Sequence, residues 1–374
     1  MPFTLSWVDH DQQARDRAEK VLALLGEREA RDELGLGPIR DSLSDLLFPG
    51  TSTIQTRLRY FLIVPWVYRT LEDEGIADDE VWTKGRDLEL KVSEHLRATS
   101  EAGVFGRRAG RRLRRLPSSV YWLGLGTWGL RHDSAGQNGA SRWHRGLPKR
   151  PSGFPQIDTL DLTAAEAEYL QDRVAQSVPD SLLAHLFRLA RPAECRFAWQ
   201  HPGYAEFRES HRAALEHARL FSEVIYGAPL LYNLLLARRA QREDKITEYR
   251  KELETWALDL DRSALDNWSV MDFWSTVCRR RRINPGARDF VDGWIDLART
   301  SALDVERHGI PADDSPPARL VRMREKTLKR ERSRFLNRRL LDQWGGAAGV
   351  YRMDYRWNNV RNYVREVAAG LGQE

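Results

Sequence analysis

The residues best suited to chemistry are concentrated between positions 31 and 60. Pro38 is well placed in the first turn of a short helix, where its missing N–H donor costs nothing. On a helical wheel Asp41 and Asp45 then share one side, opposite an apolar side made by Ile39, Leu43, Leu46 and Leu47. Two carboxylates that point together away from a core can transfer protons or stabilise a positively charged sugar. They can equally form a solvated polar face with no further role.

A turn and a second helix are expected directly after this first helix. Pro49 and Gly50 end the first helix, and Ser52 followed by Gln55 matches the capping-box pattern that begins a new one. The pattern therefore predicts a helix N-terminus close in sequence to the two carboxylates.

The start of the second helix is a candidate anion site. The backbone N–H groups of Thr51, Ser52 and Thr53 would point out of the helix, where a phosphate binds readily. Arg57 and Arg59 would lie just inside the same helix. Together these groups can hold a sugar–phosphate backbone beside a carboxylate. The alternative is a structural corner in which the arginines neutralise the aspartates.

Basic residues are concentrated in three segments of the chain. Residues 101–150 carry a net charge of +9, residues 279–282 of +4 and residues 319–339 of +8, which leaves −16 for the rest of a chain whose total is +5. A preference for arginine in codon usage explains why 51 of the 59 basic residues are Arg, but it does not explain the clustering. Such segregation is typical of a protein that binds a polyanion. The candidate phosphate contacts are Arg107, Arg108, Arg111, Arg112, Arg332 and Arg334.

Two tryptophans, Trp122 and Trp128, follow the first run of arginines. Aromatic rings among arginines suit a groove that follows phosphates and stacks bases, and burial in the core is the alternative for both. Most other tryptophans fall at helical spacing beside apolar residues and are expected in the core, among them Trp256, Trp268, Trp274 and Trp294.

Helical periodicity dominates the rest of the chain. Apolar residues three and four apart predict helices over residues 9–25, 79–98, 163–176, 204–226, 229–256, 287–307, 319–344 and 357–371. Strand-like alternation occurs only at residues 3–8. We therefore expect a mainly α, multi-helical globular protein with at most a small β element. Residues 1–130 would form an N-terminal helical lobe with the candidate site, 131–157 an irregular connecting loop, and 158–374 a C-terminal lobe with a basic helix.

Several classes of function are not favoured. Cys195 and Cys278 have neither disulfide-framework nor zinc-site spacing, and a reducing cytoplasm is the expected location. No apolar run approaches the roughly 18 residues of a membrane span, and Asp9 and Asp11 stand where a signal peptide needs apolar residues. The chain has no phosphate-binding loop ending in Lys-Ser/Thr and no histidine pair at metal spacing. No cofactor or metal is expected.

Three runs in the candidate segment also carry a resemblance to a known family. Residues 32–35 (DELG), 39–41 (IRD) and 48–57 (FPGTSTIQTR) resemble the hallmark of an uncharacterised bacterial family, a domain of unknown function carried in phage-defence islands beside restriction-like methylases and helicases. The resemblance extends to residues 116–122, 227–233, 331–335 and 355–357. It implies defence against foreign DNA, with modified phage DNA and other island proteins as partners. It implies no catalytic residues.

Two hypotheses follow from the residues and the resemblance. The first is a DNA glycosylase that removes modified bases and leaves abasic sites, because hydrolysis of an N-glycosidic bond needs neither metal nor nucleotide. Asp41 or Asp45 would be the catalytic carboxylate, and Gln55 and Tyr60 would read the flipped base. The alternative is a non-catalytic DNA-binding or adaptor subunit of a multi-gene restriction-type system.

Overall fold

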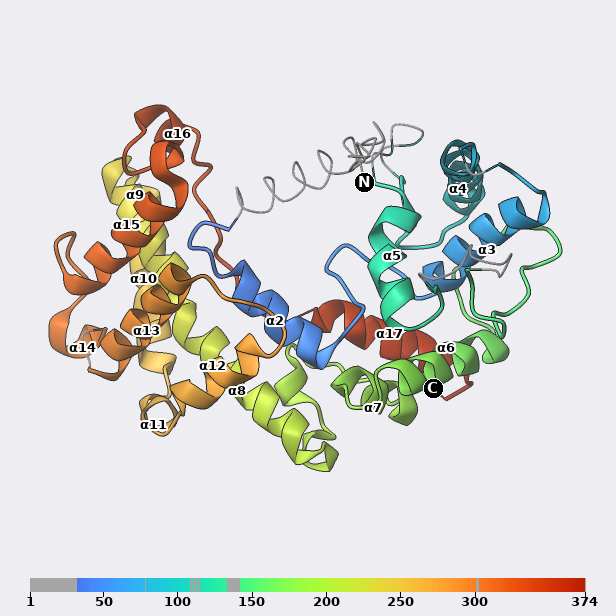
Figure 1. Ribbon diagram of the computed structural model, residues 1–374. Helices are drawn as coiled ribbons and strands as arrows, with labels where there is room; N and C mark the ends of the chain where they lie inside the picture. Colours follow the sequence, from blue (N-terminus) through green and yellow to red (C-terminus); the bar gives the residue numbers. More distant parts are fainter. Residues whose placement is uncertain are drawn as a thin grey trace, which may run out of the picture. The chain divides into compact units, whose positions relative to one another are not determined.

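The regular secondary structure of the described residues is helical. The computed structural model describes residues 32–77, 79–107, 110, 113, 115–132, 142–300 and 303–373 (Figure 1). In these residues the only β pairing is an isolated bridge between Arg131 and Trp143. The expected all-α class is therefore confirmed. The strand-like alternation at residues 3–8 and the helix expected over 9–25 lie outside the described residues.

The chain divides into two compact units that are interleaved in sequence. Unit 1 comprises residues 1–40 and 219–353, and unit 2 comprises residues 41–218 and 354–374. This division differs from the lobes expected from sequence, because the irregular residues 131–157 fall inside unit 2 and the last helix returns to it. Glycine and proline content marks a loop, but it does not tell whether the helices on either side pack together.

Unit 1 is built from helices that follow one another between residues 227 and 342. Its helices are α9 (Gly227–Arg239), α10 (Glu243–Asp259), α11 (Arg262–Asp266), α12 (Val270–Cys278), α13 (Pro285–Arg299), α14 (Val305–His308), α15 (Pro316–Lys329), the 3₁₀ turn η4 (Arg330–Arg332) and α16 (Arg338–Asp342). Helix α9 is buried from Gly227 to Ala237 and contacts both α10 and α15.

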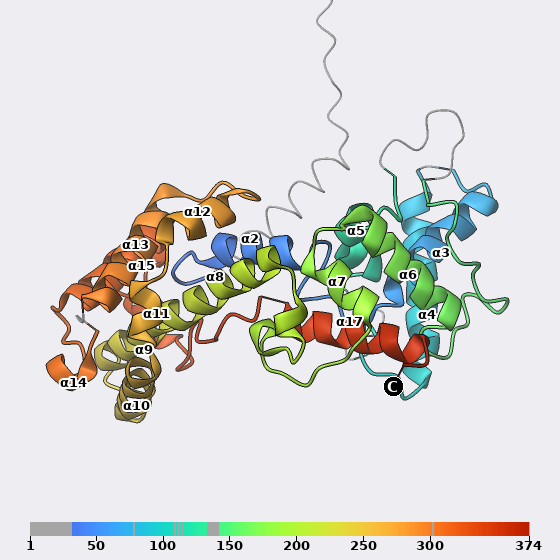
Figure 2. The same ribbon diagram turned by 90° about the horizontal axis from the view of Figure 1, so that it is seen from below.

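Unit 2 joins the first helices of the chain to the last one. Its helices are α3 (Tyr60–Asp73), α4 (Val81–Ala98), α5 (Pro117–Thr127), α6 (Ala164–Ser177), α7 (Leu182–Leu189), the 3₁₀ turns η2 (Ala198–Gln200) and η3 (Tyr204–Glu206), and α17 (Trp357–Gly370). Helix α17 lies beside α6 and α7 in both views (Figures 1 and 2). Two further helices, α2 (Gly37–Leu47) and α8 (Glu209–Ile225), contain residues assigned to each unit.

The core follows the apolar periodicity of the sequence. In α17, within the helix expected over 357–371, the buried stripe includes Trp357, Val360, Tyr363, Val364 and Val367. Trp128 is a core residue, because it is fully buried, stacks on Phe61 at 3.8 Å between ring centroids and donates its Nε1–H to the carbonyl oxygen of Pro49. Among the described residues, one helical stretch, Glu209–Ala240, is long and apolar enough to cross a membrane by length and composition, but 89% of its apolar window is buried inside the fold.

Among the described residues, four of the expected helices are interrupted: residues 204–226 form η3 and α8, residues 287–307 form α13 and α14, and the other two break at a left-handed residue. Residues 229–256 form α9 and α10, which are separated where Gln241 adopts a left-handed backbone with φ of 55°. Residues 319–344 form α15 and α16, which are separated after Arg330, with φ of 51°. Periodicity continues through both breaks because the helices on either side bury the same kind of apolar stripe.

Candidate functional site

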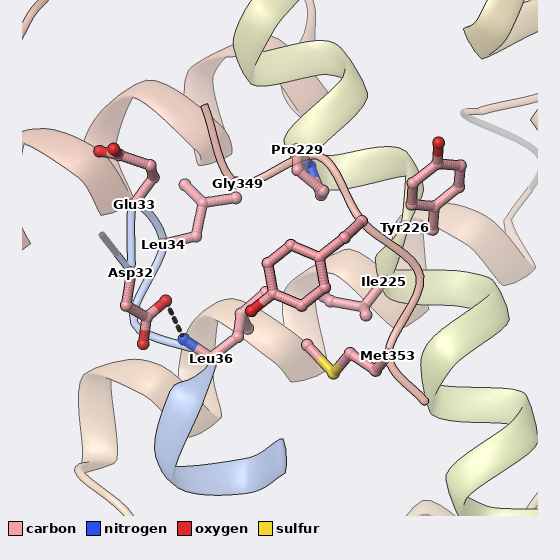
Figure 3. Close-up of a pocket in the computed structure, with 10 residues that line it drawn as sticks. Asp32, Glu33, Leu34, Leu36, Ile225, Tyr226, Pro229, Gly349 and Met353 are labelled. Carbon is pink, nitrogen blue, oxygen red and sulfur yellow. Dashed lines mark hydrogen bonds between the residues drawn. The ribbon is translucent and has the colours of Figure 1, made fainter. Parts of the chain in front are cut away.

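The Asp32–Gly35 run of the hallmark segment organises the start of α2. The carboxylate of Asp32 accepts hydrogen bonds from the backbone N–H groups of Leu36 at 2.9 Å and Gly37 at 2.6 Å (Figure 3). A carboxylate in this position caps the helix and interacts favourably with its N-terminal dipole. Gly35 has φ of 68°, a left-handed conformation that glycine adopts without strain. Asp32 and Gly35 therefore have a structural role.

Glu33 anchors a buried charged cluster in unit 1. Its carboxylate, 8% exposed, lies 2.7 Å from Arg334 and 3.4 Å from Lys329. Arg334 also donates to the hydroxyl of Tyr232 at 3.0 Å. The Arg334 side chain is 24% exposed, and its guanidinium is held by a carboxylate and a phenol inside unit 1. These internal partners give Arg334 a structural role.

The cavity beside this run is small. It encloses about 30 Å³ and is lined mainly by apolar side chains and by Asp32, Glu33 and two tyrosines (Figure 3). That volume corresponds to about one water molecule. The cavity therefore has no room for a nucleobase.

Asp41 and Asp45 lie beside a cation, Arg356, that the sequence did not indicate as their partner. Arg356, which precedes α17, donates to Oδ1 of Asp45 at 2.7 Å and lies 3.9 Å from Oδ1 of Asp41. The side chains of Asp41, Asp45 and Arg356 are 17%, 29% and 10% exposed. The structure thus brings the two predicted carboxylates together, on one guanidinium.

The backbone that presents Arg356 is strained. Tyr355 and Arg356 have φ values of 35° and 57°, so two consecutive residues other than glycine adopt the left-handed region. Each such residue costs on the order of 1–2 kcal/mol. The guanidinium partly offsets this cost by also donating to the carbonyl oxygen of Thr51 at 2.6 Å. The Tyr-Arg-Trp run at 355–357 was recognised in the sequence, but nothing in its spacing indicates Asp45 as a partner.

No helix begins at Ser52, and that prediction is wrong. The oxygen of the Gln55 side chain does accept from the backbone N–H of Ser52 at 2.9 Å, as in a capping box, but residues 51–59 form turns and α3 begins only at Tyr60. The N–H of Thr51 donates to Phe48. With these amides used internally, the expected anion site at 51–53 does not form, although Thr53 itself is exposed.

Helix α17 holds this turn segment in place. Asn359 donates to the carbonyl oxygens of Ser52, at 3.2 Å, and Gln55. The buried Gln55 also accepts from Tyr363 at 3.2 Å and donates to Gly50 at 3.2 Å. All hydrogen-bonding groups of the Gln55 amide except one N–H are therefore used, and the side chain is not presented to a base.

Arg57 is an internal arginine, not a phosphate contact. Its guanidinium lies 2.8 Å from Glu366, 3.0 Å from Glu101 and 2.8 Å from Asp161, and its side chain is 15% exposed. Burial lowers its pKa, but the charges of Glu366 and Glu101 outweigh this effect, so the pKa is raised. Helix α17 thus supplies partners to this arginine as well.

The remaining predicted residues of the segment are also engaged. Arg59 is 5% exposed and pairs with Glu166 at 2.9 Å, where it donates further to the Thr159 carbonyl oxygen. The Tyr60 hydroxyl is buried and accepts from the N–H of Phe105 at 3.2 Å. Arg57 and Arg59 therefore lie in a structural corner, the alternative to a phosphate site. Their partners are glutamates and Asp161 rather than Asp41 and Asp45.

The first basic segment is described only in part. Arg107 is exposed and donates to the carbonyl oxygens of Thr99, at 3.4 Å, and Glu101. Arg108, Arg111 and Arg112 lie outside the described residues. Trp122 is half-buried, and the guanidinium carbon of Arg131 lies 4.6 Å from its ring centroid.

The third basic segment has a buried side and an exposed side. Arg324 and Lys329 are buried, Arg334 is partly buried, and Arg324 donates to the Leu34 carbonyl oxygen at 2.8 Å. Arg319, Met323, Lys326 and Arg330, spaced four, three and four residues apart, are exposed on α15 and at its end, as is Arg332. The helical period therefore places part of this segment's charge in the core and part on the surface.

The described residues hold no cluster of three or more His, Cys, Asp or Glu side chains that could ligate a metal ion.

A family model described as a family of unknown function (DUF6361) matches residues 2–370. The chain belongs to that family. No curated protein and no solved structure matches it.

Proposed function

We propose that this protein binds DNA through an exposed basic surface on unit 1, and that it does so in defence against foreign DNA. The observation that carries the proposal is the exposed face of α15, where Arg319 and Lys326 lie on one side of a helix whose other basic residues are largely buried, with the exposed Arg330 directly after its end. A row of cations at helical spacing suits contacts with successive phosphates.

A second group of exposed cations in the same unit supports the proposal. Arg279, Arg280, Arg281 and Arg282 follow α12 directly and are all exposed. The partly buried Arg334 is instead paired with the buried carboxylate of Glu33. Exposed cations gathered in two runs of one unit raise the local positive potential, which favours an external polyanion as their partner.

Duplex binding at several salt concentrations tests the proposal. Wild-type protein should bind a labelled duplex with an affinity that falls as salt rises. The double variant Arg319→Ala, Lys326→Ala should bind more weakly, with a salt slope reduced by about 0.9 for each phosphate that is no longer neutralised. The matched control is Arg250→Ala, Lys251→Ala, which removes one Arg and one Lys from exposed positions of α10 in the same unit. Equal effects of the two double variants, or no salt-dependent binding at all, would overturn the proposal.

The second candidate function is hydrolysis of an N-glycosidic bond in modified DNA. The observation that favours it is the geometry of Asp45, a partly exposed carboxylate on a guanidinium supplied by strained backbone. Strained backbone occurs preferentially at functional sites. Asp45, together with Asp41, would stabilise the positive charge that develops on the sugar. Gln55 and Tyr60 have no part in this form of the proposal.

Abasic sites report this activity directly. Purified protein incubated with modified and unmodified phage DNA should produce abasic sites in the modified DNA. The near-isosteric Asp45→Asn variant should still bind DNA and lose about 10²–10⁴-fold in rate, the range of acid–base or charge assistance by one carboxylate. The control is Asp87→Asn, an exposed aspartate of α4 in the same unit. Abasic sites made equally by Asp45→Asn would refute the role of Asp45. No abasic sites with wild-type protein that binds DNA would leave the adaptor function.

A further inference from the structure

An aromatic cluster in unit 2 reaches the surface at Trp82. Tyr68 of α3 and Trp143 are buried, and Trp122 of α5 is half-buried, whereas Trp82 near the start of α4 is 44% exposed. The ring centroid of Trp82 lies 5.8 Å from that of Tyr68 and 5.9 Å from that of Trp122. The rings beneath hold Trp82 by edge-to-face and tilted contacts. An indole fixed in this way and still exposed loses little conformational entropy when a second flat ring stacks on it.

Leu123, next to Trp122 on α5, is another exposed apolar side chain of the same unit, at 77%. Gly85, one turn after Trp82, lets α4 approach α3, because a Cβ atom there would lie 3.1 Å from the Tyr68 ring. The close approach brings the Trp82 ring onto the cluster. Trp122 cannot serve as the outer platform itself, because Arg131 lies over its ring.

The charges near these rings indicate the kind of ligand that could bind there. The Trp122 and Trp143 rings of the cluster lie in the chain segment with a net charge of +9, to which Arg131 and the exposed Arg115 also belong, whereas Tyr68 and Trp82 precede that segment. On the acidic side, Glu72 is 3.8 Å from Arg142, while Glu80, two residues before Trp82, is exposed. Aromatic rings beside arginines bind unpaired bases and their phosphates.

We propose that Trp82 is a stacking platform for an unpaired nucleotide, so that the form of DNA this protein recognises contains single-stranded or flipped-out bases. This inference rests on the proposed function, because it names the class of DNA that the protein takes. A base within a duplex is covered on both faces by its neighbours and cannot reach the indole, whereas an unpaired base has both faces open.

The test compares single-stranded and duplex DNA on the full-length protein. Fluorescence anisotropy with a labelled thymidine oligonucleotide and with a duplex of equal length gives two dissociation constants. In Trp82→Ala, the single-strand constant should rise by between about 5-fold and 100-fold, the range expected for one stacked base, and the duplex constant should stay within about twofold of wild type. Trp82→Phe should restore much of the single-strand affinity, because a phenyl ring also stacks.

Two further variants complete the design. Met271→Ala removes a side chain that is 75% exposed on α12 and is the matched control, so both constants should be unchanged. Glu80→Gln should strengthen single-strand binding, because it removes a negative charge beside the phosphate path. An unchanged single-strand constant in a folded Trp82→Ala variant would refute the platform while leaving duplex binding by α15 intact. No binding of either form by wild-type protein would refute both proposals, and a Trp82→Ala defect confined to capture of a protein would identify a protein-binding surface instead.

Discussion

Arg356 and Asp45 form a hydrogen-bonded ion pair at 2.7 Å although 311 positions of sequence separate them. The pair joins the residue before α17 to α2, and the same guanidinium reaches Thr51. It therefore fixes the position of the carboxylates and of the turn segment that follows α2. Its removal should change both stability and the geometry of the candidate site.

Two substitutions of Arg356 distinguish the stability that its side-chain hydrogen bonds contribute from the stability that its left-handed backbone costs. We expect Arg356→Ala to lower the free energy of unfolding by about 1–3 kcal/mol, because the charge-assisted hydrogen bonds are removed. Arg356→Gly removes the same bonds but relieves the left-handed strain, so it should be more stable than the Ala variant by about 1 kcal/mol. Urea unfolding of both variants measures the difference. An Ala variant at least as stable as the Gly variant would contradict the strain at this position.

Replacing Arg334 should destabilise the protein, whereas replacing Arg332, two residues before it, should leave its stability nearly unchanged. Arg334→Ala removes the partner of buried Glu33 and of Tyr232, and should lower the free energy of unfolding by about 2–4 kcal/mol. Arg332→Ala alters an exposed side chain and should change stability by less than about 0.5 kcal/mol. Thermal unfolding followed by circular dichroism distinguishes them. Similar melting temperatures for the two variants would show that the Glu33 cluster is not stabilising.

Glu89 should make unit 2 less stable as the pH rises. Burial raises the pKa of this carboxyl to about 7, against the opposing hydrogen bonds from Ser118 at the start of α5. Because the pKa of Glu89 is higher in the folded than in the unfolded state, its contribution to the free energy of unfolding is complete below about pH 4.5. That contribution is lost as the pH rises toward 7. At pH 8 the isosteric Glu89→Gln should be more stable than wild type, by on the order of 1–3 kcal/mol. Unfolding at pH 5 and pH 8 gives the comparison, and a Gln variant that is less stable at pH 8 would contradict it.

Three histidines around Phe207 should make the protein less stable as the pH falls, the opposite of the effect of Glu89. The rings of His185 and His201 lie 5.4 and 5.2 Å from Phe207, and the ring of His211 lies 5.9 Å from that of His185. Each has one buried ring nitrogen without a hydrogen-bond partner: Nε2 of His185, Nε2 of His201 and Nδ1 of His211. Burial is the main cause that lowers the pKa of all three.

The folded state therefore resists protonation that the unfolded chain accepts. Stability from this cluster is complete above about pH 6.5 and is lost as the pH falls below that value. Neighbouring charges on Arg188, Arg191 and Arg208 add to the effect, and Glu206 and Asp180 oppose it. In a Glu89→Gln background, unfolding at pH 7.5 and 5.5 should show a loss of stability that His211→Gln reduces. An equal loss in both proteins would exclude His211 from the effect.

The sequence by itself determined the helical class and much of the core. Period-three and period-four apolar residues predict α4, α6 and the buried stripe of α17 well, because burial of one helix face is a local property of the chain. The sequence also placed Asp41 and Asp45 on one polar face, and they do meet a common partner.

Only the tertiary structure decided what the polar residues do. Arg57 and Arg59 resemble phosphate ligands in sequence, but Glu366 and Glu166 neutralise them after the chain has folded back over more than 100 positions. The hydrogen bonds of Asn359 to Ser52 and Gln55, and of Tyr363 to Gln55, likewise show a turn held by α17 where a helix start was expected. A charged side chain is satisfied by whichever opposite charge the fold brings within a few ångströms, and such partners have no periodicity from which they can be predicted.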